Sequence, residues 1–334
     1  MSVLATTFWT AGALLVHTHV TYPLSLALIA RLRRRQEPVA SPAAVTPPVS
    51  LIIAAHDEAS VIERRVRNAL ETEYPRELLE VIVTSDGSSD ETVHLAQDAG
   101  ADLVLDLSRR GKVEAQNAAV DRARGEILAF SDANSFWQPD ALRLLVAALA
   151  DEGVGYVCGQ VRFTDEGGQS QEGAYWRYEM WIRGHESALA SVTAGNGAIY
   201  AVRRAAYARV DPRVSHDLSL PSRLVREGWR AVDVDDARAT EKMVPTVEGE
   251  WVRKRRMMAH AWPMVVTGGL LDPRGYPPAY AAMILSHRAL RYASPFLHVA
   301  ALAASVARPR RHRVALVAQL GLLAAAAIEA VVRT

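Results

Sequence analysis

The sequence predicts an α/β fold: a mostly parallel sheet with helices on both faces, flanked by apolar segments at both ends of the chain. From residue 49 onward, short apolar runs alternate with amphipathic stretches, which is typical of a parallel sheet covered on both faces. Residues 3–30 carry no acidic or basic side chain other than two histidines, and a segment of that length can cross a bilayer. Of the 334 residues, 50% are apolar, which favours a membrane-attached protein.

Charge and cysteine content exclude several classes of protein. The formal net charge of +1 argues against a dedicated nucleic-acid-binding protein. The single cysteine, Cys158, leaves no internal disulfide and no cysteine-based zinc site.

The N-terminal region is expected to anchor the protein. Residues 1–35 are predicted to form a transmembrane helix. Its apolar part is followed directly by the basic run at 31–35, and such runs stay on the cytoplasmic side. The part of the chain that follows is therefore expected inside the cell, at the plasma membrane. Residues 36–48 are rich in Pro and Ala and predict a linker.

Residues 49–254 are expected to form the cytoplasmic domain. Strands are predicted at 49–55, 79–86, 101–107, 126–132 and 155–163, and helices at 59–72, 89–99, 112–123 and 139–150. Parallel sheets bind ligands at the carboxyl ends of their strands. Four candidate ligand-binding residues lie at such ends: His56, Glu58, Asp86 and Asp132.

The C-terminal segment, 255–334, is again apolar. Residues 255–271 run from basic to aromatic and apolar side chains, as expected of an interfacial helix in contact with membrane lipids. Residues 292–307 and 314–332 are two further hydrophobic segments, so a multi-pass protein is expected. Strict alternation places the basic loop at 308–313 outside, against the positive-inside rule, so one of these segments is expected to be re-entrant or tilted.

The segment VTSDGSSDET, residues 83–92, ends a strand at Asp86 and continues into a Gly-Ser-Ser turn at Gly87. The Asp86 carboxylate can accept an N–H group of a nucleotide base. The alternative is an ordinary strand–turn–helix connection in which Asp90 caps the helix.

Lys112 stands just before a helix that contains Asn117. Because the helix dipole disfavours a cation at this end, an anionic neighbour is expected, either a nucleotide phosphate or Asp132. The alternative is a solvated lysine.

The stretch SDANS places Asp132 and Asn134 two positions apart at a strand end. Side chains at i and i+2 of a strand point to the same side, so the pair predicts two oxygen ligands for Mg²⁺ or Mn²⁺. A turn that merely ends the strand is the alternative.

Two later segments also carry candidate chemistry. Asp217 precedes an amphipathic helix and is either its N-cap or a general base. The basic cluster at 250–258, which contains Arg256, either contacts lipid head groups or clamps a diphosphate.

Acceptor candidates lie between these motifs. Trp176 and Trp181 belong to an aromatic helical stretch that is either a platform for sugar rings or a set of core and interface anchors. Gly195 and Asn196 lie in a Gly-Asn-Gly turn that either faces the acceptor or only reverses the chain.

In order along the chain, these motifs resemble the family 2 glycosyltransferases of GT-A, Rossmann-like fold, specifically membrane-bound bacterial members. VTSDGSSDET is the most specific match, and VSLIIAAHDEASVI, GKVEAQNAAV, FSDANS, SHDLSL and RKRRM follow the family's order. The resemblance covers about residues 49–260. It implies a membrane-anchored, inverting transfer of a sugar from a nucleotide-sugar, with a UDP-sugar as the donor expected from the family, to a lipid-linked or cell-envelope glycan.

The resemblance also implies roles for individual residues. Asp86 would contact the base, with Glu58 lining the same pocket, and Asp132 would contact the ribose or the metal. Asn134 would stand at the metal-ligand position. Asp217 would deprotonate the acceptor hydroxyl, and Arg256 would hold the diphosphate.

Three departures from the family pattern leave alternatives open. Asn134 replaces a carboxylate, His216 replaces the acidic neighbour of Asp217, and Met257 replaces the tryptophan of processive members. A processive polysaccharide synthase, which would need a channel and hence an oligomer, is one alternative. A catalytically silent nucleotide-sugar-binding scaffold is the other.

Overall fold

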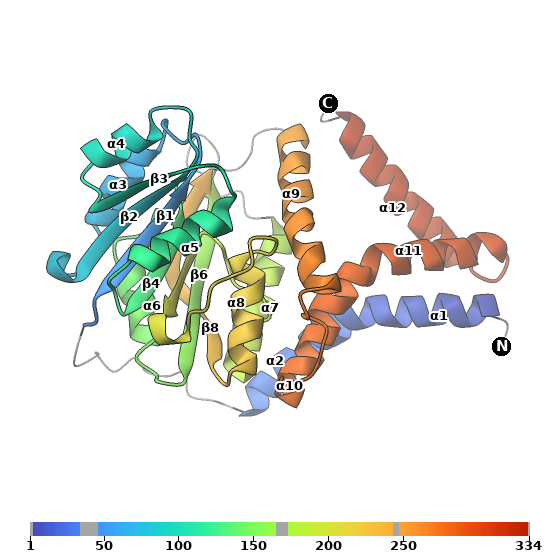
Figure 1. Ribbon diagram of the computed structural model, residues 1–334. Helices are drawn as coiled ribbons and strands as arrows, with labels where there is room; N and C mark the ends of the chain where they lie inside the picture. The colour runs from blue at the N-terminus through green and yellow to red at the C-terminus, as the bar shows by residue number, and fades with distance from the viewer. Residues whose placement is uncertain (1–2, 34–45, 165–172, 243–246, 333–334) are drawn as a thin grey trace.

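The computed structural model describes residues 3–33, 46–164, 173–242 and 247–332. Most of the predicted linker at 36–48 therefore lies outside the described residues. An eight-stranded sheet forms the centre of the molecule, and helices from both chain ends extend to one side of it (Figure 1).

The strands are β1 (Val49–Ala55), β2 (Leu79–Asp86), β3 (Leu103–Leu107), β4 (Ile127–Asp132), β5 (Phe136–Trp137), β6 (Val154–Thr164), β7 (Ile199–Arg203) and β8 (Arg230–Lys242). The helices that pack on the sheet are α3 (Ile62–Leu70), α4 (Thr92–Asp98), α5 (Lys112–Arg122), α6 (Ala141–Ala148), α7 (Ala174–Leu189) and α8 (His216–Arg226). The remaining helices are α1 (Val3–Val16), α2 (Tyr22–Arg33), α9 (Val247–Val266), α10 (Pro278–Met283), α11 (Leu290–Ala307) and α12 (Arg313–Val332).

The strand order is β3-β2-β1-β4-β7-β6-β8-β5. The first four strands are all parallel, and β6 pairs parallel with β8. The antiparallel pairs involve β7 and β5. The predicted mostly parallel sheet is therefore confirmed, and its antiparallel pairs all lie in the half that begins at β7.

Three strands were not expected from the sequence: β5, β7 and β8. β7 and β8 follow the last predicted strand and complete the sheet beside β6. β8 is rich in charged residues, many of them partly exposed, and its pairing with β6 contains two register shifts. It consequently lacks the regular alternation that identifies a strand in sequence.

Helices cover both faces of the sheet, as predicted. Alternate residues of β1 point to opposite faces, so Leu51 and Ile53 pack with α3, α4 and α6, whereas Ile52 packs with α5 and α8. The two apolar clusters hold the sheet rigid, which fixes the positions of the loops at its carboxyl edge.

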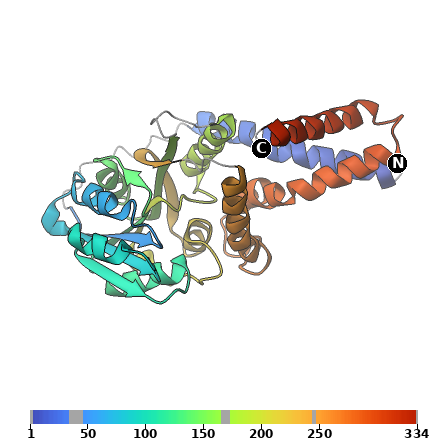
Figure 2. The ribbon, with the colours of Figure 1, turned by 90° about the horizontal axis from the view of Figure 1, so that it is seen from above.

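The terminal helices form an arm beside this domain. α1 and α11 lie side by side, and α12 turns back from the far end of α11 (Figures 1 and 2). Within the described residues, Val3–Leu32 is the one helix long and apolar enough to cross a membrane, whereas Arg313–Ala325 is apolar but shorter. A π-helical turn at His17–Thr21 joins α1 to α2. The predicted interfacial helix begins earlier than expected, at Val247, and ends at Val266.

Candidate active site

The carboxyl ends of β1, β2 and β4 meet at one edge of the sheet. The register pairs Ala54 with Asp132 and Ala55 with Ser85, so the residues that follow these strands emerge together. The prediction that four polar residues share this edge is confirmed: His56, Glu58, Asp86 and Asp132.

Hydrogen bonds join the loops after β1 and β2. The Ser89 amide donates to Asp57 Oδ1 at 2.7 Å, and the Ala59 amide donates to Asp90 Oδ2 at 3.0 Å. Asp90 Oδ1 also accepts the Thr92 amide at the start of α4. Asp57 adopts a positive φ of 53°, a conformation that aspartate tolerates better than most residues. The carboxylates of these loops therefore shape the edge. Asp90 binds the first amide of α4, but the N-cap position belongs to Glu91.

Glu58 lies half-buried among charges of both signs. Burial raises the pKa of its carboxyl, and the nearby Asp132 carboxylate raises it further, while Arg256 of α9 opposes the shift. Arg256 is thus brought within electrostatic reach of the strand ends from a distant helix. His56 lies beside this group, with Nε2 3.4 Å from Asp57 Oδ2.

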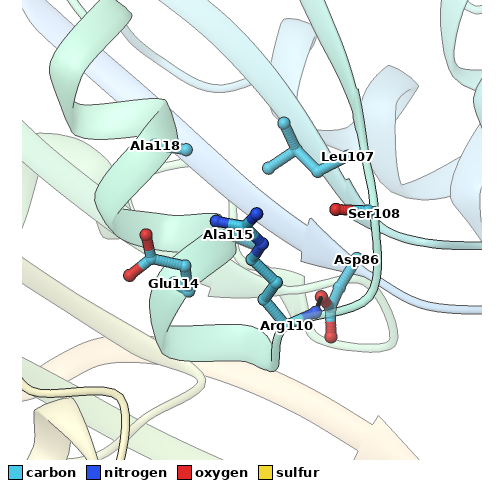
Figure 3. Close-up of a pocket in the computed structure, with 7 residues that line it drawn as sticks. All are labelled: Asp86, Leu107, Ser108, Arg110, Glu114, Ala115 and Ala118. Carbon is cyan, nitrogen blue, oxygen red and sulfur yellow. Dashed lines mark hydrogen bonds between the residues drawn. The ribbon is translucent and has the colours of Figure 1, made fainter.

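Asp86 lies at the mouth of a pocket of about 120 Å³ (Figure 3). Its Oδ1 accepts the backbone amides of Arg110 at 2.7 Å and Gly111 at 2.9 Å. The other lining residues are Leu107, Ser108, Glu114, Ala115 and Ala118. Leu107, Ala115 and Ala118 give the pocket apolar walls, and Arg110 and Glu114 add charged ones. With the fixed Asp86 carboxylate, this pocket suits a flat ring that presents an N–H group, such as a nucleotide base.

Gly87 allows this pocket to close. It adopts a φ of +69°, and a Cβ atom at this position would lie 2.7 Å from the Arg109 amide nitrogen. Any other residue would push the loop after β3 away from Asp86. Gly87 therefore acts through loop geometry, and its predicted contact with a donor stays a prediction.

Lys112 forms an ion pair with Asp132 Oδ1. Of the two anionic neighbours expected for this lysine, Asp132 is the one in the structure. The lysine is the first residue of α5, after Gly111 with a φ of 98°. The pairing holds the Asp132 side chain at the edge of the sheet and keeps a cation beside it.

The prediction that Asp132 and Asn134 share one side of a strand is wrong. β4 ends at Asp132, and Ala133 and Asn134 form a turn, so the two-residue periodicity of a strand does not apply. The Asn134 side chain is exposed, which leaves its amide oxygen accessible from outside the edge.

This edge nevertheless fits a divalent cation. Burial is the main cause of the raised pKa of Glu58, and the nearby Asp132 carboxylate adds to it, so a cation at this edge would offset the Asp132 contribution. In the described part of the chain, no three His, Cys, Asp or Glu side chains cluster in a way that could hold a metal ion. The binding of Mg²⁺ or Mn²⁺ by Asp132 and Asn134 stays a prediction, and such an ion would need further oxygen ligands from a bound substrate.

Sequence reasoning missed Arg65, which lies beneath this edge and is completely buried. Its Nε donates to Ser131 Oγ at 3.2 Å, and Nη1 donates to Asn68 Oδ1 at 3.0 Å. Burial lowers the pKa of the Arg65 guanidinium to about 9, while Asp132 opposes that shift. A signal existed: Arg65 stands on the buried face of α3 with Ile62.

Asn117 is almost fully buried and makes hydrogen bonds within the protein. Its Nδ2 donates to the Val210 carbonyl at 2.8 Å, and its Oδ1 accepts the Tyr207 hydroxyl at 2.8 Å. The residue therefore holds the segment before α8 against α5. Its predicted contact with a nucleotide-sugar stays a prediction.

Asp217 occupies the second position of α8, after Ser215 at the N-cap position. The alternative of an N-cap aspartate is therefore wrong. Asp217 is half-buried, and its carbonyl accepts the Gly195 amide at 2.7 Å. This hydrogen bond uses the backbone of Asp217, so its side-chain carboxylate can still contact a ligand.

His216 points into the core. Its Nδ1 lies 2.7 Å from the Tyr200 hydroxyl, and the ring packs edge-on against Phe130. Burial, with a smaller contribution from Lys112, lowers the pKa of His216 to about 3. The imidazole is neutral at physiological pH, so it does not weaken a base at Asp217 by adding a positive charge.

Packed aromatic rings connect the end of β4 to the start of α8. Phe130, two residues before Asp132, stacks on Tyr200 and packs edge-on against His216, which precedes Asp217. Burial is the main cause that raises the pKa of the Tyr200 hydroxyl, and neighbouring tyrosines and the Asp132 and Asp217 carboxylates add to it. One aromatic cluster therefore joins the strand-end site to the start of α8.

The predicted acceptor turn lies directly against α8. A Cβ atom at Gly195 would lie 1.8 Å from the Tyr156 hydroxyl oxygen, so glycine is required there. Asn196 is buried. Its Oδ1 accepts the Ala198 amide, and its Nδ2 makes no hydrogen bond within the described residues.

The two candidate tryptophans differ in their surroundings. Trp176 Nε1 donates to the Val161 carbonyl at 3.1 Å, and its ring packs edge-on against Phe163. Trp176 therefore fits the alternative in which the aromatic side chain anchors the core. Trp181 is 41% exposed and packs beside His185. Trp181 is thus the one of the pair that keeps an open face.

Residues 50–210 match the model of the family described as Glycosyl transferase family 2. A mannosyltransferase from Pyrobaculum calidifontis, solved in complex with GDP-Man and Mn²⁺, has a similar structure throughout. The TM-score is 0.77 at 25% sequence identity, and the match covers 96% of this chain and 92% of that chain.

A beta-monoglucosyldiacylglycerol synthase from Trichormus variabilis is 29% identical over 228 residues, which is 63% of this chain and 48% of that protein. A glycosyltransferase from Haloferax volcanii is 30% identical over 132 residues, which is 38% of this chain and 43% of that protein. The chain therefore spans about half the length of these curated relatives.

Proposed function

Because the chain belongs to glycosyltransferase family 2, we propose that it transfers a sugar from a nucleotide-sugar to an acceptor hydroxyl at a membrane surface. The donor is a nucleoside-diphosphate sugar, with UDP as the first choice, and the acceptor is a lipid-linked or cell-envelope glycan. The reaction inverts the anomeric centre and depends on Mg²⁺ or Mn²⁺.

One observation carries the proposal. His216, which precedes Asp217, packs edge-on against Phe130 of β4, the strand that ends at Asp132. A nucleotide-sugar whose phosphates sit at Asp132 would therefore present its sugar toward the start of α8. This packing supports Asp217 as the proposed general base.

The donor would bind along the carboxyl edge of the sheet. Its base would enter the pocket beside Asp86, whose carboxylate is already held by the Arg110 and Gly111 amides and needs no rearrangement to accept an N–H group. Its diphosphate would lie near Lys112 and Arg256, which supply positive charge to the departing oxygen atoms. A bound divalent cation would neutralise charge on the departing diphosphate.

Asp217 would act on the acceptor. The acceptor O–H bond breaks, and its proton passes to the Asp217 carboxylate while the oxygen bonds to the anomeric carbon. The bond from that carbon to the diphosphate oxygen breaks, and the nucleoside diphosphate leaves with the electron pair. Attack from the face opposite the leaving group gives inversion. Because His216 is neutral, it adds no positive charge that would weaken Asp217 as a base.

Membrane attachment is part of the proposal. The helix Val3–Leu32 would span the plasma membrane once, α11 would lie beside α1, and α9 would lie at the cytoplasmic surface of the membrane. Exposed apolar side chains on α9, which include Trp251 and Met257, would contact lipid. The acceptor would then reach Asp217 from the membrane side.

The test is hydrolysis and transfer with a panel of UDP- and GDP-sugars, in detergent, with Mg²⁺, with Mn²⁺ and with EDTA. We expect metal-dependent release of one nucleoside diphosphate. Asp217→Asn should reduce turnover at least about a hundredfold, the contribution typical of a general base, while donor binding is retained. The matched control is Asp211→Asn, an exposed aspartate six positions away that pairs only with Arg213. A fully active Asp217→Asn enzyme would remove this assignment.

A further inference from the structure

A buried charge cluster joins the membrane arm to the catalytic domain. Glu186 of α7 is completely buried and accepts hydrogen bonds from the Tyr22 hydroxyl of α2 at 2.5 Å and the Thr193 hydroxyl at 2.8 Å. His287 Nδ1 lies 2.7 Å from Glu186 Oε1, and its Nε2 lies 3.3 Å from Glu179 Oε2. The cluster thus links α2, α7 and the π-helical turn Ile284–Ala289 that precedes α11.

The charges inside this cluster are matched. His287 and Arg291 face the two carboxylates, and Arg291 forms an ion pair with Glu179. His287 is the main neighbour that holds the pKa of the Glu179 and Glu186 carboxyl groups below the ordinary range in spite of burial, and Arg288 contributes to both, with Arg291 acting on Glu179. Both carboxylates are therefore ionised and already have partners.

Arg288 acts on these carboxylates at longer range, without an ion pair. Its Nε donates to Thr193 Oγ1 at 2.9 Å, which fixes the direction of the guanidinium. Within the described residues, no carboxylate lies within 4.0 Å of it, although every other part of the cluster is paired. The side chain is only partly buried. Arg288 is therefore an oriented cation that keeps donors for an external anion.

Arg288 lies on the acceptor side of the proposed active site. Thr193, which holds it, stands two residues before Gly195, whose amide bonds the Asp217 carbonyl. The Tyr292 hydroxyl, one helical turn after Arg288, lies within Coulombic range of both Arg288 and Asp217. The segment from Thr193 to Gly195 therefore connects Arg288 to the start of α8, where Asp217 lies.

Arg288 also stands where the domain meets the membrane arm. It immediately precedes α11, which packs along α1, and the neighbouring Ser286 hydroxyl contacts His17 at 3.0 Å. A ligand with an apolar tail along this arm would bring its head group to Arg288. Only an anionic head group would use the guanidinium fully.

We propose that Arg288 is the binding residue for a phosphate group of a lipid acceptor, held beside Asp217 at the junction of the catalytic domain and the membrane arm. The inference rests on the proposed function and narrows it: the acceptor is a lipid phosphate or diphosphate, and a neutral lipid does not satisfy the site. Arg288 selects the acceptor, and Asp217 activates its hydroxyl.

The test measures binding separately from turnover. Detergent-purified wild-type protein, Arg288→Gln and Arg288→Lys are titrated with farnesyl phosphate and with farnesol, followed by tryptophan fluorescence. The matched control is Arg67→Gln, an exposed arginine of α3 that pairs only with Glu63. Thermal unfolding of each variant shows that it is folded, and nucleoside diphosphate binding with Mn²⁺ shows that the donor site is intact.

We expect the wild type and Arg67→Gln to bind farnesyl phosphate at least about tenfold more tightly than farnesol. Arg288→Gln should lose that preference and keep nucleotide binding, and Arg288→Lys should restore part of it. Equal affinity for farnesyl phosphate and farnesol, or an unchanged preference in Arg288→Gln, would overturn the proposal.

A second arm identifies the source of the phosphate. Phosphatidylcholine vesicles with and without phosphatidylglycerol are bound to the same variants. An Arg288-dependent gain from phosphatidylglycerol alone, without farnesyl phosphate binding, assigns the phosphate site to a membrane head group and overturns the acceptor assignment. Arg288-dependent farnesyl phosphate binding in a protein that turns over no donor would refute the proposed function and leave the phosphate site standing.

Discussion

Replacing Arg65 with methionine should leave the fold at least as stable as the wild type, although the side chain is completely buried. Burial lowers the pKa of the Arg65 guanidinium to about 9. At about 1.4 kcal/mol per pKa unit, keeping this group charged inside the protein costs roughly 5 kcal/mol. Methionine fills much of the same space and carries no charge.

The two hydrogen-bond partners of Arg65 would not be orphaned. Ser131 Oγ also donates to the Asp132 carbonyl at 3.0 Å, and Asn68 Oδ1 also accepts the Trp137 amide at 2.9 Å. The usual penalty for breaking a buried polar pair is therefore small here. Substitution of buried ionic groups by apolar ones of similar size is often neutral or stabilising by about 1–4 kcal/mol.

The assay is urea-induced unfolding of Arg65→Met in detergent, with Arg67→Met as the exposed control, which should change stability by less than about 0.5 kcal/mol. Donor binding should weaken in Arg65→Met, because a positive charge beneath Asp132 is lost. Destabilisation of Arg65→Met by more than about 2 kcal/mol would refute the reasoning. It would mean that the interactions of the guanidinium with its neighbours outweigh the free-energy cost of burying its charge.

Three further outcomes follow from the site. Gly195→Ala should cost about 1–3 kcal/mol of stability and most of the turnover, because its methyl group would collide with the Tyr156 hydroxyl. Gly197→Ala in the same turn should be tolerated, because its methyl group would meet nothing within 4 Å. Thermal unfolding and turnover assays measure both variants. As pH falls below about 6.5, His216 becomes protonated in the unfolded chain but stays neutral in the folded protein. The free energy of unfolding, measured in urea, should therefore fall by up to about 1.4 kcal/mol per pH unit until about pH 3. The variant His216→Gln should flatten that slope. Metal-dependent turnover should rise with pH through the raised pKa of Glu58, and the pH–rate profile of Glu58→Gln should lack that step.

The parts of the site that the sequence predicts are those with a local signal. Asp86 and Asp132 each end an apolar run, and parallel pairing brings any such residues to one edge. Lys112 at a helix start required an anion, and Asp132 provides it. These predictions needed only the order of the strands along the chain.

The parts that were missed depend on contacts between distant segments. The Asn117 amide is taken by Val210, 93 positions later, which no spacing in sequence reveals. Arg65 looks like one of several surface arginines until α3 is oriented on the sheet. Asn134 was misplaced because the exact end of β4 decides whether it continues a strand or enters a turn.

The hydrogen bond from Tyr22 to Glu186 bears on how this protein is prepared in the laboratory. The hydroxyl comes from the N-terminal helix, and the carboxylate also holds Thr193, two residues before the glycine that contacts Asp217. Removing residues 3–33 to obtain a shorter fragment would leave the buried Glu186 short of one donor and loosen that turn. The N-terminal helix thus contributes to the structure of the domain, and the proposed activity should be measured on the whole chain in detergent or nanodiscs.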